Sequence, residues 1–322
     1  MKPVILLIGK NGQVGAELLR LLPQLGEVVA LDRGQMDLSQ PDDIYRIIRE
    51  IRPQLIVNAA AYTAVDRAET DEGRARSINA EAPGLMAKEA KKIGAALVHY
   101  STDYVFDGMK KTPYEETDLA NPINVYGKTK LAGEEAIREV GVPHLIFRTA
   151  WVYATRGRNF MLTILRLATE REELRIVRDQ IGAPTSSQQI AETTTKILAQ
   201  LTKQSNVKAL FTGISGTYHM TAAGATTWYD FATAILEEAS CMPHDIPWFV
   251  AATSGRPLIT SRIIPITTQE YPTPAHRPMY SVLSHSLLMR TFGVKMQDWR
   301  TQLRLDFAIE RKAQQEVAAS EI

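Results

Sequence analysis

The sequence has little cysteine, no long apolar run and no excess of charge of either sign. Cys241 is the only cysteine among 322 residues, so no disulfide can form within the chain, and a reducing compartment such as the cytoplasm is expected. The apolar run at residues 4–8 is too short for a signal-peptide core or a membrane span. With 37 basic residues against 36 acidic ones, nothing in the charge balance favours nucleic acid or an anionic membrane as a partner.

Metal-binding patterns are also missing. The six histidines show no HExxH-like spacing, and a single cysteine cannot form a ligand cluster, so no metal site is predicted. His99 and His144 fall within apolar segments, where hydrogen-bonded core residues are expected rather than ligands.

What the first half does contain is a strict alternation of two kinds of segment. Short runs rich in valine and isoleucine alternate with longer segments of helical period, which predicts buried parallel strands joined by crossover helices. We therefore expect an α/β fold with a Rossmann-type, doubly wound parallel sheet. The predicted strands are residues 4–8, 28–31, 55–57, 96–100 and 145–147, and the predicted helices are residues 14–22, 44–51, 82–93 and 125–140.

After residue 150 the pattern becomes irregular. Helices are predicted at 160–169 and 188–201 and a strand at 174–177, followed by a Gly-, Thr- and Pro-rich region from 212 to 279 with one helix at 228–239. Long irregular stretches in compact proteins are usually functional or belong to a small second lobe. We therefore expect an NAD(P)-binding domain at 1–150, a region at 151–308 that completes the sheet and forms a smaller substrate-binding lobe, and a polar tail at 309–322.

A glycine-rich segment follows the first predicted strand directly. Gly9 permits a tight turn, Gly12 lets the backbone approach a pyrophosphate, and Gly15 allows close packing of the helix on the strand. The pyrophosphate would lie over the free N–H groups at the start of the helix. A glycine pattern alone is weak, but its place between a strand and a helix favours dinucleotide binding.

The end of the second strand carries two residues with opposite demands. Asp32 could accept hydrogen bonds from the adenosine ribose hydroxyls, whereas Arg33 could hold a 2′-phosphate. The sequence therefore predicts a nicotinamide cofactor and leaves NADH and NADPH both open.

Tyr126 and Lys130 suggest the chemistry. They lie four residues apart on a predicted helix and share one face, and no other of the 11 tyrosines has a lysine at this spacing. A phenol donates a proton to a carbonyl more readily when a nearby ammonium stabilises the phenolate. Lys128 points elsewhere on the helix. Thr102 ends the fourth strand, at the edge where ligands bind in such sheets, and could hold a substrate carbonyl.

Seven segments together carry a family resemblance: GKNGQVG, VNAAAYTAVDRAE, STDYVFDG, NVYGKTKLAGE, RTAWVY, DQIGAPT and YPTPAHRP. In this order they resemble the dTDP-4-dehydrorhamnose reductases of the extended short-chain dehydrogenase/reductase superfamily, over about residues 2–305. The resemblance implies reduction of dTDP-4-dehydro-L-rhamnose to dTDP-L-rhamnose by NADPH or NADH, with a nucleotide sugar as partner. A homodimer stays open. Ala150 stands where serine is common in the family.

The resemblance also implies roles for individual residues. The catalytic triad falls on Thr102, Tyr126 and Lys130, and Lys130 would also bind the nicotinamide ribose. Substrate contacts fall on Thr102, Asp103 and Trp151, and Arg277 would lie near the diphosphate. The implied cofactor contacts, together with the glycine turn and ribose residues above, are Gly9, Gly12, Gln13, Val14, Gly15, Asp32, Arg33, Asp37, Leu38, Ala61, Tyr62, Thr63, Tyr126 and Lys130.

Two kinds of alternative remain from the sequence: a related nucleotide-sugar reductase or dehydratase, and a non-catalytic NADP-binding regulatory subunit. A nucleotide-sugar dehydratase of the same superfamily usually has glutamate two residues after the threonine, and Tyr104 stands there instead. A catalytically silent regulatory subunit that keeps the dinucleotide fold is disfavoured by the intact Thr102, Tyr126 and Lys130, although a complete triad does not prove turnover.

Overall fold

A parallel sheet of six strands forms the centre of the molecule. The computed structural model describes residues 2–202, 211, 213–243 and 245–308. The strand order is β10-β5-β4-β3-β1-β2, so the chain winds outward from β1 in one direction and from β3 in the other. This confirms the predicted doubly wound sheet. The strands are β1 Val4–Ile8, β2 Glu27–Leu31, β3 Leu55–Asn58, β4 Ala96–Thr102, β5 His144–Thr149 and β10 Gly216–His219.

The central strand β1 is apolar throughout because both faces of the sheet are covered. Ile5 and Leu7 of β1 belong to one buried cluster, and Leu6 and Ile8 belong to the other. Successive side chains of a strand point to opposite faces, so a run without polar residues is what a doubly covered strand requires.

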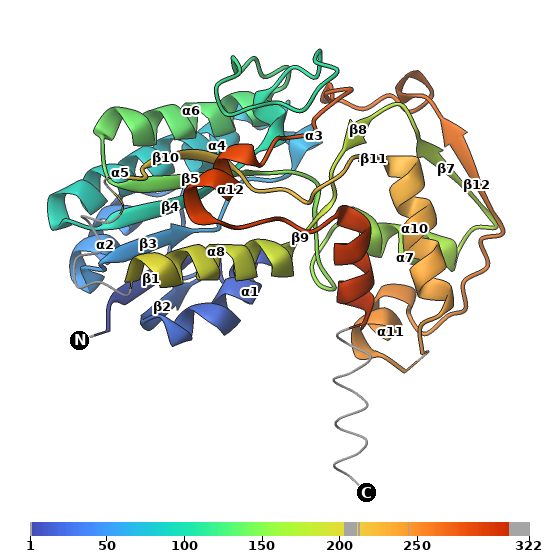
Figure 1. The fold of residues 1–322 in the computed structure, drawn as a ribbon, viewed down its shortest axis with the longest axis horizontal. Helices are drawn as coiled ribbons and strands as arrows, with labels where there is room; N and C mark the ends of the chain where they lie inside the picture. Colours follow the sequence, from blue (N-terminus) through green and yellow to red (C-terminus); the bar gives the residue numbers. More distant parts are fainter. Residues whose placement is uncertain (1, 203–210, 212, 244, 309–322) are drawn as a thin grey trace, which may run out of the picture.

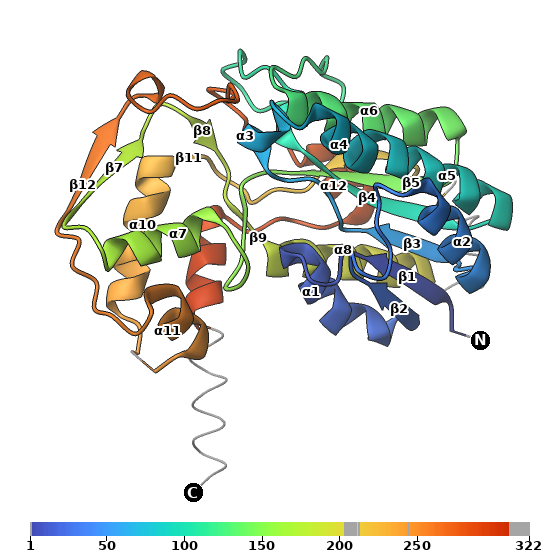
Figure 2. The same ribbon diagram turned by 180° about the vertical axis from the view of Figure 1, so that it is seen from behind.

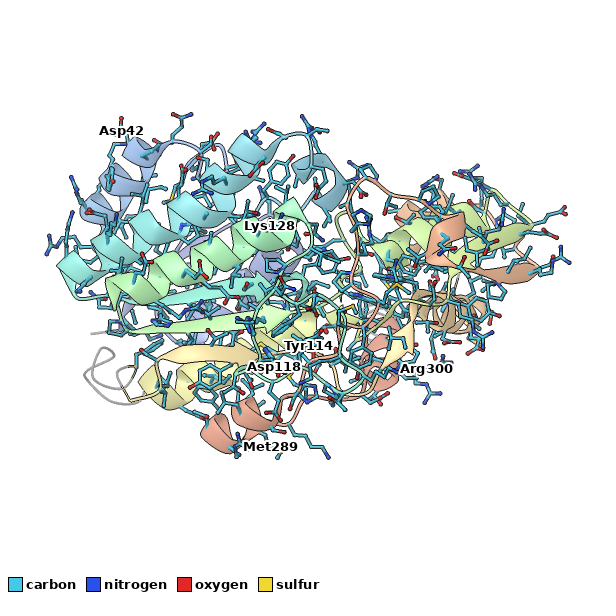
Figure 3. All side chains as sticks on the ribbon, turned by 90° about the horizontal axis from the view of Figure 1, so that it is seen from above. Asp42, Tyr114, Asp118, Lys128, Met289 and Arg300 are labelled. Atoms are coloured by element: carbon cyan, nitrogen blue, oxygen red, sulfur yellow. The ribbon has the colours of Figure 1, made fainter. Side chains whose placement is uncertain are left out.

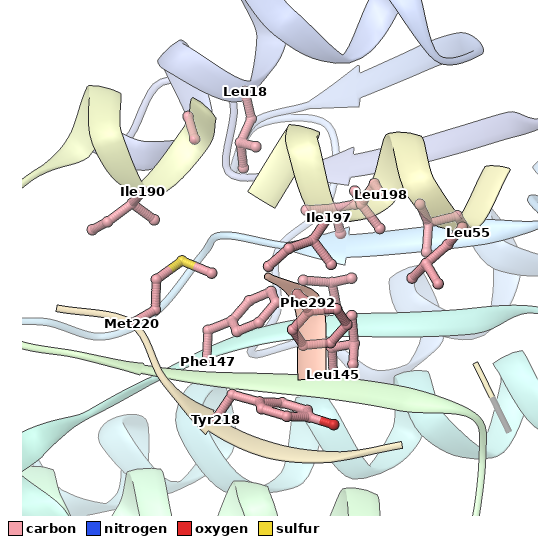
Figure 4. Packing of buried hydrophobic residues seen from close by; sticks show 14 of the residues in the cluster. Leu18, Leu55, Leu145, Phe147, Ile190, Ile197, Leu198, Tyr218, Met220 and Phe292 are labelled. Carbon is pink, nitrogen blue, oxygen red and sulfur yellow. The ribbon is translucent and has the colours of Figure 1, made fainter. Parts of the chain in front are cut away.

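The two faces carry different sets of helices (Figures 1 and 2). The helices α1 Gln13–Leu21, α8 Ser187–Thr202 and α12 Ser286–Phe292 cover one face. Figure 4 shows how side chains of these helices meet those of the strands, with Leu18 and Ile197 on the helix side and Leu145 and Phe147 on the sheet. The helices α2 Pro41–Ile51, α5 Ala82–Ile93 and α6 Val125–Val140 cover the other face.

A smaller lobe stands beside the sheet, with its own buried cluster around Phe231, Leu303 and Phe307. Its helices are α7 Phe160–Ala168, α10 Trp228–Ser240 and α11 Pro247–Thr253, together with helical residues 299–308, and its strands β7 Glu173–Val177 and β12 Arg262–Ile266 pair in parallel. Short strands connect the lobes: β6 Val152–Tyr153 with β9 Thr185–Ser186, and β8 Ile181–Gly182 with β11 Thr226–Thr227. Two further short helices, α3 Val65–Ala68 and α4 Glu72–Arg76, follow β3.

The prediction for residues 212–279 was wrong in part. Besides α10, this region contains β10, α11 and β12. Pro265 lies inside β12, and proline argues against a strand in sequence analysis. It is tolerated here because, within the part of the chain that the structure describes, β12 pairs only with β7 and is therefore an edge strand. The division of the chain at residue 150 remains a prediction, since β10 completes the sheet from beyond that point.

Among the helices of the described residues, none is both long and apolar enough to pass through a bilayer.

Candidate active site

A cavity of about 890 Å³ opens at the carboxyl ends of the strands, bounded by the sheet and by the start of α10. This is the edge at which doubly wound sheets bind ligands. Of the residues predicted from the sequence, only Gly15 and Arg277 do not line it. The others do: Gly9, Gly12, Gln13, Val14, Asp32, Arg33, Asp37, Leu38, Ala61, Tyr62, Thr63, Thr102, Asp103, Tyr126, Lys130 and Trp151.

The glycine segment folds as a tight turn between β1 and α1. Gly9 has φ of +90°, and a Cβ there would lie 2.8 Å from the backbone nitrogen of Ala60. A Cβ on Gly15 would lie 2.0 Å from the carbonyl oxygen of Gly9, so α1 can pack on the turn only with glycine at this position. Gly12 caps α1 and lines the cavity. The free N–H groups at the start of α1 therefore fit a pyrophosphate.

Asp32 lines the cavity and is held by one lysine and by amide donors. Its Oδ2 lies 3.4 Å from Lys10 Nζ and accepts a hydrogen bond from Asn11 Nδ2 at 3.2 Å, while its Oδ1 accepts from the backbone of Gly34. Although burial opposes it, the hydrogen bond and charge of Lys10 hold the pKa of Asp32 below its usual value. Arg33, mostly exposed, contacts Asp37 at 3.5 Å. Lys10 and Asn11 were missed because glycine turns vary at these positions.

Thr102 and Asp103 form a buried pair at the end of β4. The Thr102 hydroxyl donates to Asp103 Oδ1 at 3.0 Å and accepts from the backbone nitrogen of Tyr104 at 3.2 Å. Burial raises the pKa of Asp103 to about 7. The pair therefore presents a positioned hydroxyl and an acidic group that ionises close to neutral pH.

Tyr126 is positioned by the way α6 begins. Asn124 caps the helix by accepting from Gly127 N at 2.8 Å, and a Cβ on Gly127 would lie 2.1 Å from the Tyr104 carbonyl oxygen, so only glycine permits this approach. The Tyr104 ring meets the Tyr126 ring edge-on, with centroids 5.8 Å apart. Burial raises the pKa of Tyr126 to about 12, whereas its hydrogen bond with Thr102 acts in the opposite direction. At neutral pH this phenol therefore carries its proton.

Lys130 lies one turn further along α6 and is 1% exposed. Its Nζ donates to the carbonyl oxygen of Tyr100 at 2.6 Å and lies 3.3 Å from His99 Nε2. Burial lowers the pKa of Lys130 to about 8. Lys128, labelled on α6 in Figure 3, is exposed, as its predicted orientation requires.

Two indole rings close the cavity on the side of the smaller lobe. Trp151 follows β5 with φ of +47°, a backbone conformation that is strained for any residue but glycine. Its ring stacks on that of Trp228, with centroids 3.5 Å apart. Gln180 accepts from Trp228 Nε1 at 3.1 Å, and a Cβ on Gly182 would lie 2.5 Å from the Trp151 ring. Trp228 was missed because 76 residues separate it from Trp151 and no local pattern links them.

Comparison with known proteins identifies the family. The model of the RmlD substrate binding domain matches residues 1–311. A dTDP-4-dehydrorhamnose reductase of Burkholderia thailandensis is 50% identical over 92% of this chain and 95% of the relative, and that of Escherichia coli K12 is 44% identical over 93% and 95%. The chain belongs to this family. The crystal structure of the Bacillus anthracis dTDP-4-dehydrorhamnose reductase in complex with NADP has a TM-score of 0.82 and 33% identity, covering 96% of this chain and 99% of that one.

The family motifs meet in the structure over long sequence separations. Arg277 of YPTPAHRP forms a two-pronged ion pair with Asp66 of VNAAAYTAVDRAE, with N–O distances of 3.0 and 2.8 Å. Asn124 of NVYGKTKLAGE donates to the His276 carbonyl oxygen at 2.7 Å. Arg277 is thus turned toward α3, outside the lining of the cavity. In this reductase fold its visible role is to tie the loop at 273–278 to the main domain.

Proposed function

We propose that this chain reduces dTDP-4-dehydro-L-rhamnose to dTDP-L-rhamnose, with NADPH or NADH as cofactor, as its dTDP-4-dehydrorhamnose reductase relatives are named to do. The observation that carries the proposal is that Thr102, Tyr126 and Lys130 line one cavity with the glycine turn of a dinucleotide site. The reduced nicotinamide supplies the hydride. Gly9, Gly12 and the start of α1 would hold its pyrophosphate. Asp32 and Arg33 directly follow β2, where the adenosine ribose would bind.

Tyr126 is the proton donor in this proposal. General acid catalysis requires a group that is protonated before the reaction and lies at the reacting oxygen. Burial keeps the phenol protonated at neutral pH, and the hydrogen bond with Thr102 holds it at the end of β4. When the keto sugar binds, the Thr102 hydroxyl would turn its single proton from Asp103 Oδ1 to the carbonyl oxygen of the substrate and so hold that oxygen beside the phenol.

The indole pair forms the substrate side of the cavity. Trp151 offers a flat apolar face to the sugar nucleotide, held in place by Trp228 and Gly182. Arg277 serves the substrate indirectly, because its guanidinium is engaged by Asp66. Elimination of water is disfavoured, since the residue after Asp103 is an aromatic ring against Tyr126 rather than a second carboxylate.

The test is an assay of reduced-nicotinamide consumption with the purified chain, with and without the keto-sugar nucleotide, alongside Tyr126→Phe. The variant keeps the ring and its packing, so cofactor affinity should be unchanged while kcat falls by about 10²–10⁴-fold. Wild-type single-turnover rates in Tyr126→Phe would remove the tyrosine as proton donor. Cofactor binding without any turnover by the wild-type chain would favour the silent regulatory subunit.

The proposal also includes a cytoplasmic location and a homodimer. The single cysteine is consistent with a reducing compartment. Met109 and Leu119, in the segment between β4 and α6, have 81% and 88% of their surface exposed, and such apolar side chains are of the kind that a second copy covers. Light scattering of the purified chain measures the assembly, and a mass of one chain would exclude the dimer.

A further inference from the structure

The loop at 154–159, which leads from β6 into the smaller lobe, lies against the start of α1. Asn159 Nδ2 donates to Gln13 Oε1 at 2.9 Å, although 146 residues separate the two along the chain. A Cβ on Gly157, whose φ is +75°, would lie 3.5 Å from Gln13 Cγ. The loop therefore contacts α1 at its first residue, at the helix end whose free N–H groups fit a pyrophosphate.

Asn159 fixes the shape of this loop as well as its place. Its Nδ2 also donates to the carbonyl oxygens of Ala154 at 2.8 Å and Arg156 at 3.1 Å. Its Oδ1 accepts from the backbone nitrogen of Leu162 at 3.0 Å and so caps α7. One side chain thus ties together the loop, the helix that follows it and the start of α1.

The glycine turn offers a pyrophosphate backbone donors but little positive charge. Lys10 is the only cationic side chain in residues 9–15. Its Nζ donates to Gln35 Oε1 at 2.6 Å and lies 3.4 Å from Asp32 Oδ2, so its charge is already paired. A pyrophosphate is negatively charged on each phosphate, and the dipole of α1 offsets only part of that charge. A further cation at this point would therefore strengthen binding.

Arg158 is placed to supply that cation. Its side chain lines the cavity together with Gly12 and Gln13. Among the described residues no carboxylate forms an ion pair with Arg158, whereas Arg156 lies 3.9 Å from Glu17 and outside the lining of the cavity. A guanidinium binds phosphate oxygens through two parallel hydrogen bonds, which suits it to a diphosphate.

We propose that Arg158 is a further cofactor-binding residue, whose guanidinium pairs with the pyrophosphate of the nicotinamide dinucleotide over the start of α1. The hydrogen bond between Asn159 and Gln13 holds the loop at 154–159 in position for this contact. This rests on the proposed function, because the ligand is the cofactor of that reaction. The sugar nucleotide also carries a diphosphate, but the contact of the loop with Gln13 favours the cofactor.

The test compares two arginines of the same loop. Both Arg158 and Arg156 are exposed, so Arg158→Met and Arg156→Met remove the same charge without opening the core. In titrations of the full chain, Arg158→Met should raise the Kd of NADPH and of NADH about tenfold each, because both carry the pyrophosphate. Arg156→Met should change neither value. Equal Kd values for the two variants overturn the proposal.

Fragments distinguish the possible sources of the phosphate. ADP-ribose carries the cofactor pyrophosphate without the nicotinamide, 5′-AMP carries a single phosphate, and dTDP carries the diphosphate of the sugar nucleotide. Arg158→Met should weaken binding of ADP-ribose about tenfold and leave the other two unchanged. A loss confined to dTDP would place the guanidinium on the substrate, and a loss for NADPH without one for NADH would place it on the 2′-phosphate. Either result overturns the proposal.

Asn159→Ser tests the hydrogen bond to Gln13. Serine is a good N-cap and keeps the acceptor for Leu162, but its short side chain cannot reach Gln13 Oε1. Stopped-flow displacement of NADPH should then show a dissociation rate about 3–10-fold above that of the wild-type chain. An unchanged rate contradicts the role given to Asn159. The Tm of the variant, measured alongside, checks that α7 has kept its cap.

The outcomes separate this proposal from the proposed function. Titration needs no turnover, so a weaker cofactor in Arg158→Met is informative even if the wild-type chain reduces no keto-sugar nucleotide. That combination supports the contact of Arg158 and contradicts the proposed function alone. Turnover by the wild-type chain with an unchanged Kd in Arg158→Met contradicts the contact alone.

Discussion

Gly182 lies directly against the indole of Trp151, so close that a single added methyl group would come within 2.5 Å of the ring. The same ring stacks on Trp228 at a centroid distance of 3.5 Å. A short strand of the smaller lobe therefore sets the position of an aromatic face in the cavity. The DQIGAPT motif, which contains both Gln180 and Gly182, has a physical explanation in this contact.

Gly182→Ala should displace the Trp151 ring. Overpacking of this kind costs about 1–3 kcal/mol, and we expect the KM for the keto-sugar nucleotide to rise roughly tenfold, equivalent to about 1.4 kcal/mol, with cofactor affinity unchanged. Steady-state kinetics and cofactor titration measure the two effects. Gly213→Ala is the control, because nothing lies within 4 Å of its added methyl group. Equal KM values for the two variants would contradict the role assigned to Gly182.

Asp32→Ala should shift the cofactor preference toward NADPH. The substitution removes the carboxylate that repels a 2′-phosphate. It also frees Lys10, whose Nζ lies 3.4 Å from Asp32 Oδ2, to pair with that phosphate. The ratio of kcat/KM values for NADPH and NADH is the measurement. Lys10→Met is the companion variant and should move the ratio toward NADH. An unchanged ratio in both variants would mean that neither side chain distinguishes the ribose hydroxyl of NADH from the 2′-phosphate of NADPH.

Asp66→Asn and Arg277→Met should have similar effects. The pair joins α3 to the loop at 273–278, and its hydrogen bonds hold the pKa of Asp66 below its usual value. We expect each variant to weaken binding of the keto-sugar nucleotide and the double variant to add little, with a coupling of about 0.5–3 kcal/mol. Isothermal titration of the four proteins measures it. A large loss in Arg277→Met with none in Asp66→Asn would place the guanidinium on the substrate diphosphate instead.

The stability of the smaller lobe should fall as pH rises toward 8. Burial raises the pKa of Asp306 from 3.8 to about 7, and its Oδ1 accepts from Ser186 Oγ at 3.0 Å. Because the folded-state pKa lies above the unfolded one, the stabilisation is complete below pH 3.8 and is lost as pH rises through 7. The difference corresponds to an upper bound on the order of 4 kcal/mol.

Asp306→Asn removes this ionisation, so its Tm should depend less on pH between 5 and 8 than that of the wild-type chain. Thermal unfolding at several pH values measures the difference, with Asp42→Asn, at an exposed position of α2, as control. Parallel Tm profiles for the wild type and Asp306→Asn would show that Asp306 ionises as freely in the folded chain as in the unfolded one.

Local patterns determined much of this protein. Apolar runs covered on both faces predict the strands. The glycines of residues 9–15 predict the turn because Gly12 and Gly15 both approach the carbonyl oxygen of Gly9 within the same seven residues. Tyr126 and Lys130 share a face of α6 by helical period alone. These features depend on neighbours in the chain, so a single sequence is enough to locate them.

Only the tertiary structure decided the partners of these residues. Lys130 turns toward His99, Trp151 meets Trp228, and Arg277 pairs with Asp66 across 211 residues. The same is true of β12, whose proline is tolerated because one edge of the strand has no partner strand among the described residues. Such contacts depend on how strands and loops are brought together in space. The periodicity of residue types along the chain does not predict which side chains of distant segments will face each other.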